Sequence, residues 1–322
     1  MPRLLLPLLL TPLSACTGVQ STLDPKGPVA ASVATLWWLM FWGALLILLL
    51  VMAALCYAMF RDPDRRLRLP HIPFLIGAGL VFPTVGLTAL LIYGTDVGRR
   101  ITQAFDDPLV IHVTGHQWWW EVHYPAANGA PEVHTANELR LPVGVPVEFV
   151  IESADVVHSF WIPNLGGKVD MIPGRSNTLR LSVDRAGRFR AQCSEFCGAQ
   201  HARMGLWVIA ESPADFAEWR RDRAADATVI SNAGFDSFMD RGCSDCHRVR
   251  GTAAQGATAP DLTHLAARPT VGAVTLPFSA DTLRAWLVDH GLTLKPGSLG
   301  PDIRELDEAD IAPIAEFLEG LR

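Results

Sequence analysis

The stretch LVIHVTGHQWWWEVHY, residues 109–124, is dominated by β-branched and aromatic residues and predicts β-structure. Three runs of the same character follow it: VPVEFVIES, NTLRLSVD and GLWVIA. Glycine and proline separate these runs at spacings of roughly 8–15 residues, which is typical of a small sandwich or barrel. We therefore expect a β-domain over about 107–210, in which loops at one end could fix metal ligands.

Near the end of this region, CSEFCGAQHARM (residues 193–204) carries two cysteines, a histidine and a methionine. If the domain is exported, a disulfide between Cys193 and Cys197 is one interpretation. Zinc seldom takes a thioether ligand, and a catalytic thiol would be poorly protected in an oxidising compartment. Two thiolates, an imidazole and a methionine form a soft ligand set, which favours copper.

A second cysteine on the same loop indicates two coppers bridged by two sulfurs, because a single blue-copper ion needs only one thiolate. Each copper then requires one histidine. His201 is one candidate, and His158 in DVVHSFWIP, about 35 residues before Cys193, is the other. The spacing favours copper over the disulfide but leaves both open.

The chain begins MPRLLLPLLLTPLSACTGVQ, a basic residue and then a leucine-rich run, which is typical of a secretory signal. Its LSAC box resembles the processing site of bacterial lipoproteins. The resemblance implies a lipoprotein-type signal peptide, 1–15, and lipidation of Cys16 at the start of an exported segment, 16–32. The alternative is a short uncleaved anchor with an ordinary small-residue cleavage site.

Two uncharged apolar runs, about 33–60 and 71–94, are long enough to cross a hydrocarbon core of about 30 Å. Tryptophans at the start of the first run suit the aromatic belt of a membrane interface: Trp37, Trp38 and Trp42. The positive-inside bias puts the loop RDPDRRLRLP in the cytoplasm because of its arginines: Arg61, Arg65, Arg66 and Arg68. We therefore expect a transmembrane hairpin over 33–94, with the rest of the chain exported; a pair of buried core helices is the alternative.

Composition agrees with a chain that is part membrane anchor and part water-exposed domain. Of 322 residues, 49% are hydrophobic and 19% are charged, which averages an apolar hairpin and a more polar remainder. The remainder, roughly 225 residues, is long enough for two modest domains. A formal charge of −6 gives no indication of a nucleic-acid partner.

Four blocks, GHQWWWEVHY, DVVHSFWIP, IPGRSNTLRL and CSEFCGAQHARM, resemble subunit 2 of cytochrome c oxidase, in the same order. The resemblance covers roughly 33–210. It implies a cupredoxin-like β-sandwich over 95–210 with a dinuclear copper centre of the CuA type. The implied copper ligands are His158, Cys193, Cys197, His201 and Met204, with Glu195 ligating through its backbone carbonyl. The Glu195 carboxylate is expected to bind magnesium shared with the catalytic subunit.

In this family the tryptophan directly after His-Gln is the point of electron entry, and Trp118 occupies that position. The simpler alternative is that a tryptophan of this strand is only core, because alternate residues face opposite sides. The remaining histidines of the region match no copper ligand and are expected to be structural or surface residues: His112, His116, His123 and His134.

A charged, alanine-rich segment, 211–228, predicts a short helix or linker, and a second domain over 229–322 follows it. The second domain contains the haem-attachment pattern C-x-x-C-H at Cys243, Cys246 and His247, with two thioethers and a proximal iron ligand. A redox-active cysteine pair is the alternative, but it has no need of the histidine.

The rest of this domain resembles a class I cytochrome c, an all-α fold. The blocks APDLTHLAAR and LKPGSLGPD resemble those of cytochrome domains fused to subunit 2 in one bacterial oxidase type, and the Pro260 carbonyl is expected to hold the His247 ring. A helix over about 306–321 is predicted from the spacing of its apolar residues: Ile311, Ile314, Phe317, Leu318 and Leu321.

The sixth iron ligand departs from the family pattern. Relatives place a methionine directly before the proline of the block that reads KPGSLGPD here, and Gly300 occupies that position. No methionine follows Met239, which is expected to pack rather than ligate. We expect either His290 or an open sixth position, and a structural role for His264.

A second departure lies in the membrane. Many relatives carry a glutamate near the start of the second membrane helix, at the mouth of a proton path, where this chain has Ile76. No Glu or Asp occurs in 71–94. Ionisable residues in a membrane are costly and usually functional, so we expect proton entry through His71 or a residue of the catalytic subunit.

The resemblance implies the electron-input subunit of a proton-translocating haem–copper oxidase in a bacterial inner membrane, with both redox domains on the periplasmic or outer face. Electrons would pass from a soluble or membrane cytochrome c donor through covalent haem c and two coppers to subunit 1, which reduces oxygen. Other membrane subunits and the lipid bilayer complete the expected partners. A copper-containing nitric oxide reductase is the alternative, and a copper chaperone is a more distant one.

Overall fold

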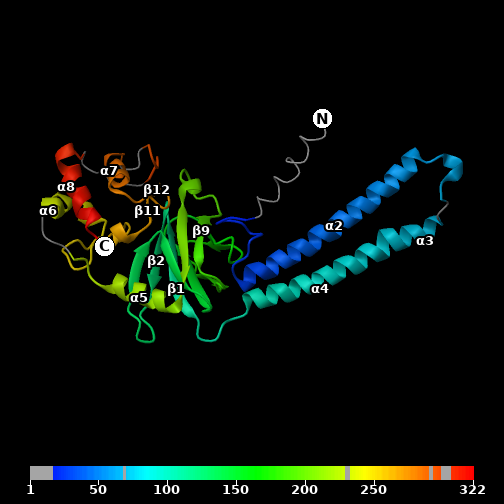
Figure 1. The fold of residues 1–322 in the computed structure, drawn as a ribbon, viewed down its shortest axis with the longest axis horizontal. Helices are drawn as coiled ribbons and strands as arrows, with labels where there is room; N and C mark the ends of the chain where they lie inside the picture. Colours follow the sequence, from blue (N-terminus) through cyan, green and yellow to red (C-terminus); the bar gives the residue numbers. More distant parts are fainter. Residues whose placement is uncertain (1–16, 68–69, 229–232, 290–292, 299–305) are drawn as a thin grey trace. The chain divides into compact units, whose positions relative to one another are not determined.

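A computed structural model describes residues 17–67, 70–228, 233–289, 293–298 and 306–322. The chain divides into two compact units. One unit is 31–104, and the other joins the residues up to 30 with 105–322. Each unit is described by itself below (Figure 1).

The smaller unit contains the two apolar helical segments. Helix α2 is Pro28–Phe60. The second segment is continuous from α3 (His71–Ile76) through the π-helical turn η3 (Gly77–Val81) into α4 (Phe82–Thr102). Both segments are long and apolar enough to span a membrane, and their most apolar windows are not buried within the protein. The helices extend beyond the predicted bounds of 33–60 and 71–94.

The π-helical turn explains how the second segment accommodates its proline. Pro83 has no N–H to continue the helical ladder, and it lies in the first turn of α4. Directly before it, the Phe82 N–H donates to the carbonyl of Gly77, five residues back. A single π-turn of this kind widens the helix and re-routes the interrupted hydrogen bonds.

The larger unit is built on two five-stranded sheets, ordered β3-β2-β1-β5-β8 and β4-β10-β9-β6-β7. The strands are β1 Leu109–His116, β2 Trp119–Tyr124, β3 Val133–Ala136, β4 Glu138–Pro142, β5 Val147–Ser153, β6 His158–Trp161, β7 Val169–Met171, β8 Asn177–Leu181, β9 Gly187–Cys193 and β10 Gly205–Glu211. Alternate residues of β1 and β2 are fully buried, as the sequence pattern predicts. Their apolar faces form one core with the second sheet.

Helix α5 (Pro213–Ala224) lies within the segment expected to be a short helix or linker. Its Ser212 side chain caps the first turn by accepting from the Asp215 N–H. Phe216 and Trp219 are buried in the sandwich core, where their rings contact Tyr124. This part of the segment therefore belongs to the sandwich, because two apolar residues three apart share one helix face.

The helical domain follows. It comprises α6 (Ala233–Asp240), the turns η5 (Cys243–Asp245) and η6 (Leu265–Ala267), a small β11–β12 pair (Thr270–Val271 and Leu276–Pro277), α7 (Ala280–Asp289) and α8 (Glu308–Glu319). Helix α8 begins at a capping box formed by Asp307 and Asp310. Its predicted apolar face is buried against α6 and α7. The predicted fold class, an apolar helix pair followed by a β-sandwich and a helical domain, is confirmed.

Candidate metal and haem sites

The sandwich topology brings the candidate copper ligands together from distant parts of the chain. His158 begins β6 and Cys193 ends β9, and these strands pair antiparallel. Met204 lies just before β10, and its carbonyl accepts a hydrogen bond from the Cys193 N–H at 3.1 Å. His201 lies in the short turn η4 (His201–Arg203) of the loop between β9 and β10. All of these residues therefore meet at one end of the second sheet.

The side-chain distances describe a compact cluster around two sulfurs. The Sγ atoms of Cys193 and Cys197 are 3.7 Å apart. Cys193 Sγ lies 3.8 Å from His158 Nδ1, and Cys197 Sγ lies 3.6 Å from His201 Nδ1. Cys197 Sγ is also 3.9 Å from Met204 Sδ, which leaves one imidazole beside each sulfur and the thioether beside one of them.

This geometry fits a metal centre and excludes the disulfide in this conformation. A disulfide requires an S–S distance of about 2.05 Å, and both cysteines are free. Metal–thiolate and metal–imidazole bonds are about 2.3 Å and 2.1 Å long, so a metal ion can reach both atoms of each pair. His158, Cys193, Cys197 and Met204 are each less than 5% exposed, which suits soft ligands of a dry site.

The protonation of the two thiols is asymmetric. The contact between the two thiols lowers the pKa of Cys193, while the same contact and burial raise the pKa of Cys197. Hydrogen bonds with Cys193 and Asp155 raise the pKa of His158 against the opposing effect of burial. Metal binding would remove the remaining thiol proton, because coordinated thiols are deprotonated.

Asp155 orients the buried His158 ring, a role that the sequence patterns missed. Asp155 Oδ1 lies 2.7 Å from His158 Nε2, which leaves Nδ1 facing Cys193. Carboxylates commonly hold metal-ligating histidines in this manner. An aspartate three residues before a candidate ligand, in DVVH, was the available signal. Gly115 lies against the other side of the ring, where a Cβ would approach its Cδ2 to 3.0 Å.

Glu195 presents its backbone and its side chain to different surroundings. Its carbonyl oxygen lies 3.2 Å from Cys193 Sγ, inside the cluster. Its carboxylate is 46% exposed and lies 3.4 Å from the Lys168 ammonium. The carbonyl can therefore face a metal bound by the sulfurs, while the carboxylate, paired with Lys168, stays accessible to solvent.

Trp118 contacts the loop 194–204 between β9 and β10, which carries candidate copper ligands and is called the copper loop below. Its indole N–H donates to the Cys197 carbonyl at 3.0 Å, and the Gln117 side-chain amide donates to the same oxygen at 2.7 Å. Gly198 permits this approach, since its φ of +114° favours glycine and a Cβ there would lie 3.0 Å from the Trp118 ring. Trp118 is 7% exposed.

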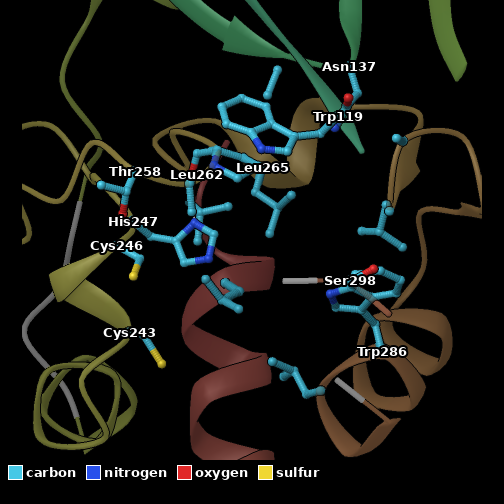
Figure 2. Close-up of a pocket in the computed structure, with 18 of the residues that line it drawn as sticks. Trp119, Asn137, Cys243, Cys246, His247, Thr258, Leu262, Leu265, Trp286 and Ser298 are labelled. Atoms are coloured by element: carbon cyan, nitrogen blue, oxygen red, sulfur yellow. The ribbon is translucent and has the colours of Figure 1, made fainter. Parts of the chain in front are cut away.

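The cysteines and the histidine of the C-x-x-C-H motif line a cavity of about 860 Å³ (Figure 2). Cys243, Cys246 and His247 lie on one side of it, and Trp286 lies across from them. Its apolar wall includes Leu262, Leu265 and residues of α7 and α8. A mostly apolar cavity beside two free thiols and an imidazole fits a haem that is held at one edge.

His247 is held in the orientation that a proximal iron ligand needs. Its Nδ1 donates to the Pro260 carbonyl at 2.7 Å, so Nε2 is left without the proton. Burial lowers the pKa of His247 and keeps the imidazole neutral. The Pro260 contact expected from the sequence is therefore present.

The same cavity reaches the sandwich. Trp119, from β2, and Asn137 lie at its edge, and Figure 2 shows the Trp119 ring beside Leu262 and Leu265. Lys295 also lines it, is 4% exposed and donates to the Trp118 carbonyl at 2.5 Å. Burial lowers the pKa of Lys295 to about 7. Trp118 thus contacts the loop of the sulfur cluster, and both Trp118 and Trp119 line this cavity.

Two of the positions considered for the sixth iron ligand, His290 and Gly300, lie outside the residues that the structure describes. Cys16, the predicted lipidation site, also lies outside them. His264 Nε2 is hydrogen-bonded with the Ala225 carbonyl at 3.0 Å, which agrees with a structural role. Met239 packs against the core of the helical domain and lines the cavity.

The four other histidines of the sandwich are partly buried and lie on the face of the first sheet opposite the core. His116 stacks on Trp119, with ring centroids 4.2 Å apart. His112, His123 and His134 are cross-strand neighbours on β1, β2 and β3. None of them belongs to the sulfur cluster.

Two family models match successive parts of the chain. A family model described as cytochrome c oxidase subunit II, periplasmic domain, matches residues 126–211, and a cytochrome c model matches residues 231–322. The periplasmic domain of subunit II of cytochrome oxidase from Bradyrhizobium japonicum is 33% identical and covers 38% of this chain and 96% of that chain, with a TM-score of 0.35.

Two bacterial relatives named cytochrome c oxidase subunit 2 align over most of the chain. The protein of Alkalihalophilus pseudofirmus is 33% identical over 222 residues, 67% of this chain and 62% of the relative. The protein of Bacillus subtilis is 31% identical over 267 residues, 78% of this chain and 72% of the relative. Because the second alignment spans more than two thirds of both proteins, the chain belongs to the cytochrome c oxidase subunit 2 family.

Proposed function

We propose that this chain is the electron-input subunit of a haem–copper oxidase. Electrons would enter from a cytochrome donor at covalent haem c, continue to a dinuclear copper centre, and leave to a catalytic subunit that reduces oxygen. The observation that carries this proposal is the sulfur cluster, with its two thiols 3.7 Å apart and an imidazole beside each. The comparisons lend no support to the nitric oxide reductase alternative.

His158, Cys193, Cys197, His201, Met204 and the Glu195 carbonyl would hold the two coppers. Copper bound there would accept and release one electron shared over both ions. The chain's part is to keep the ligands dry and fixed, because a buried, pre-arranged site rearranges little when its charge changes. Asp155 contributes by fixing His158, and the surrounding core fixes both cysteines.

In the helical domain, Cys243 and Cys246 would form the thioethers and His247 would ligate iron through Nε2. A bound haem would supply a one-electron carrier. Trp118 and Trp119 support a short route to the copper cluster, since the Trp118 indole contacts the Cys197 carbonyl and both residues line the haem cavity. Trp118 is buried here, so we assign it to electron entry from the fused haem rather than from a free donor.

The remaining assignments rest on the sequence. They are lipidation of Cys16 after removal of 1–15, an outward-facing copper and haem region, magnesium at the exposed Glu195 carboxylate, and His290 or an open position opposite His247. Proton translocation would use a partner residue or His71, because Ile76 replaces the family glutamate.

The experiment is turnover of the purified complex with reduced cytochrome c as donor, followed by optical and EPR spectra during oxygen consumption. In the variant Cys243→Ser/Cys246→Ser, no haem is attached, and cytochrome-driven oxygen consumption should fall sharply while the copper EPR signal remains. Undiminished oxygen consumption by this variant would contradict the proposed electron path.

A further inference from the structure

A second cluster of metal-ligating side chains lies on the first sheet, apart from the copper ligands. His123 on β2 and His134 on β3 are directly opposite each other in the antiparallel register. Glu132 immediately precedes β3. The ligand atoms of these three residues all lie within 4.8 Å of one another.

The three side chains converge on one point. Glu132 Oε1 lies 2.6 Å from His123 Nε2 and 3.4 Å from His134 Nε2. The two imidazole rings are parallel, with centroids 4.2 Å apart and an angle of 8° between their planes. Because Val122 and Val133 are fully buried on the opposite face, the strand backbone fixes both histidines on the outer face.

The chemistry of the cluster suits a borderline divalent cation. Two imidazoles and one carboxylate are the ligand set of open zinc sites, in which water occupies the fourth position. The Glu132 carboxylate is 55% exposed and the two imidazoles are 24–27% exposed, so a cation and its water can reach the ligands. The thiolate-rich site prefers softer ions, so the two sites differ in selectivity.

The surrounding charges also permit a cation. Arg248 brings a positive charge within electrostatic reach of His134. Arg248 lies 3.3 Å from Asp261, which offsets its charge. Glu121, whose carboxylate acts on His134 together with Glu132, adds negative charge nearby.

We propose that His123, Glu132 and His134 form a binding site for a divalent cation of the zinc class, with water as the fourth ligand. The site is distinct from the copper cluster and does not depend on the proposed electron path. The site spans the paired strands β2 and β3, and β3 is the edge strand of the sheet. Cation binding would therefore hold β3 against its neighbour.

The test uses the full chain, loaded with copper and haem and purified without a histidine tag. Equilibrium dialysis against Zn²⁺ at pH 7, with elemental analysis, should find one zinc per haem beyond the two coppers. His134→Gln and Glu132→Gln should each weaken zinc binding at least about tenfold, since each removes one of three ligands. His112→Gln is the matched control, because His112 neighbours His123 on the same face but lies outside the cluster, and its zinc binding should be unchanged.

Unchanged copper and haem spectra would establish that each variant is folded. As a second measurement, one added Cu²⁺ should give an axial EPR signal with nitrogen couplings, which His134→Gln removes. Absence of the additional zinc, or zinc binding that survives both ligand variants, would overturn the proposal and leave the cluster as a surface ion pair. Equal loss in His112→Gln would also contradict the three-ligand site.

Discussion

At the scale of single residues, Cys193 and Cys197 decide what the sulfur cluster can bind. Each sulfur has one imidazole beside it, and no disulfide joins them. If both sulfurs bridge both coppers, removal of either one destroys the shared-electron state rather than weakening it. The site is therefore expected to respond to cysteine substitution in an all-or-none manner.

The first prediction concerns Cys193→Ser and Cys197→Ser in the copper-loaded chain. Each variant should lose the mixed-valence EPR signal of one electron shared over two coppers, because an alcohol is a poor soft ligand. Cys56→Ser, in an exposed position of α2, is the control and should retain the signal. A full mixed-valence spectrum in either loop variant would refute the dinuclear assignment.

The second prediction separates the backbone of Glu195 from its carboxylate. Glu195→Gln keeps the carbonyl that lies 3.2 Å from Cys193 Sγ, so the copper EPR signal should be unchanged. The same variant should lose binding of Mn²⁺, used as a paramagnetic substitute for magnesium, because a neutral amide replaces the charged oxygen ligand. The measurement is Mn²⁺ EPR on the complex with the catalytic subunit. Retained Mn²⁺ binding would remove Glu195 from that site.

At the scale of elements, the sequence predicted which helices and strands are present better than it predicted where they begin and end. Strand alternation around 109–124 and the apolar spacing of α8 come from local periodicity, and both elements are present. The helix ends at Pro28 and Thr102 lie outside the predicted apolar runs, and in the second helix polar and charged residues continue the helix beyond its run. The π-turn before Pro83 also depends on three-dimensional hydrogen bonding rather than on composition.

Helix α5 illustrates the same limit. Its charged sequence suggested a helix or linker, but the burial of Phe216 and Trp219 depends on a partner surface that sequence spacing does not identify. The candidate ligands could be predicted because their residue types define the chemistry. Asp155 was missed although it lies only three residues before His158. Lys295 could not be predicted, because its role arises from a long-range contact with the Trp118 carbonyl.

The third prediction tests the place of α5 in the sandwich core. Phe216→Ala should lower the free energy of unfolding by about 3–5 kcal/mol, the usual cost of truncating a buried aromatic residue. Urea unfolding followed by the copper absorbance provides the measurement. Glu218→Ala, on the exposed side of the same helix, should change it by no more than about 0.5 kcal/mol. Equal effects of the two substitutions would show that α5 is only a connection.

At the scale of the whole molecule, the copper loop and the haem cavity meet around Trp118. Lys295 donates to the Trp118 carbonyl, and the Gln200 side chain donates to the carbonyl of Pro296. Lys295 and Pro296 are thereby held against Trp118 and the copper loop. Fixed geometry favours fast transfer, since the redox groups need not find each other by diffusion.

The fourth prediction removes this contact. Lys295→Met keeps the length and apolar stem of the side chain but loses the donor to the Trp118 carbonyl. Haem-to-copper electron transfer should slow by roughly tenfold to a hundredfold, the scale of a small misplacement, while the copper and haem spectra persist. Lys26→Met, which removes only an ion pair with Asp24, is the control in flash-reduction kinetics. An unchanged rate in Lys295→Met would show that the contact does not govern transfer.

The central claim, that electrons pass from the haem to the copper pair within one chain, has a direct test. In the full chain loaded with copper and haem, a light pulse reduces haem c, and absorbance then follows haem and copper separately. We predict that haem reoxidation and copper reduction share one rate constant, and that this rate constant is independent of protein concentration. A rate proportional to protein concentration, or copper that stays oxidised while the haem remains reduced, would contradict the account.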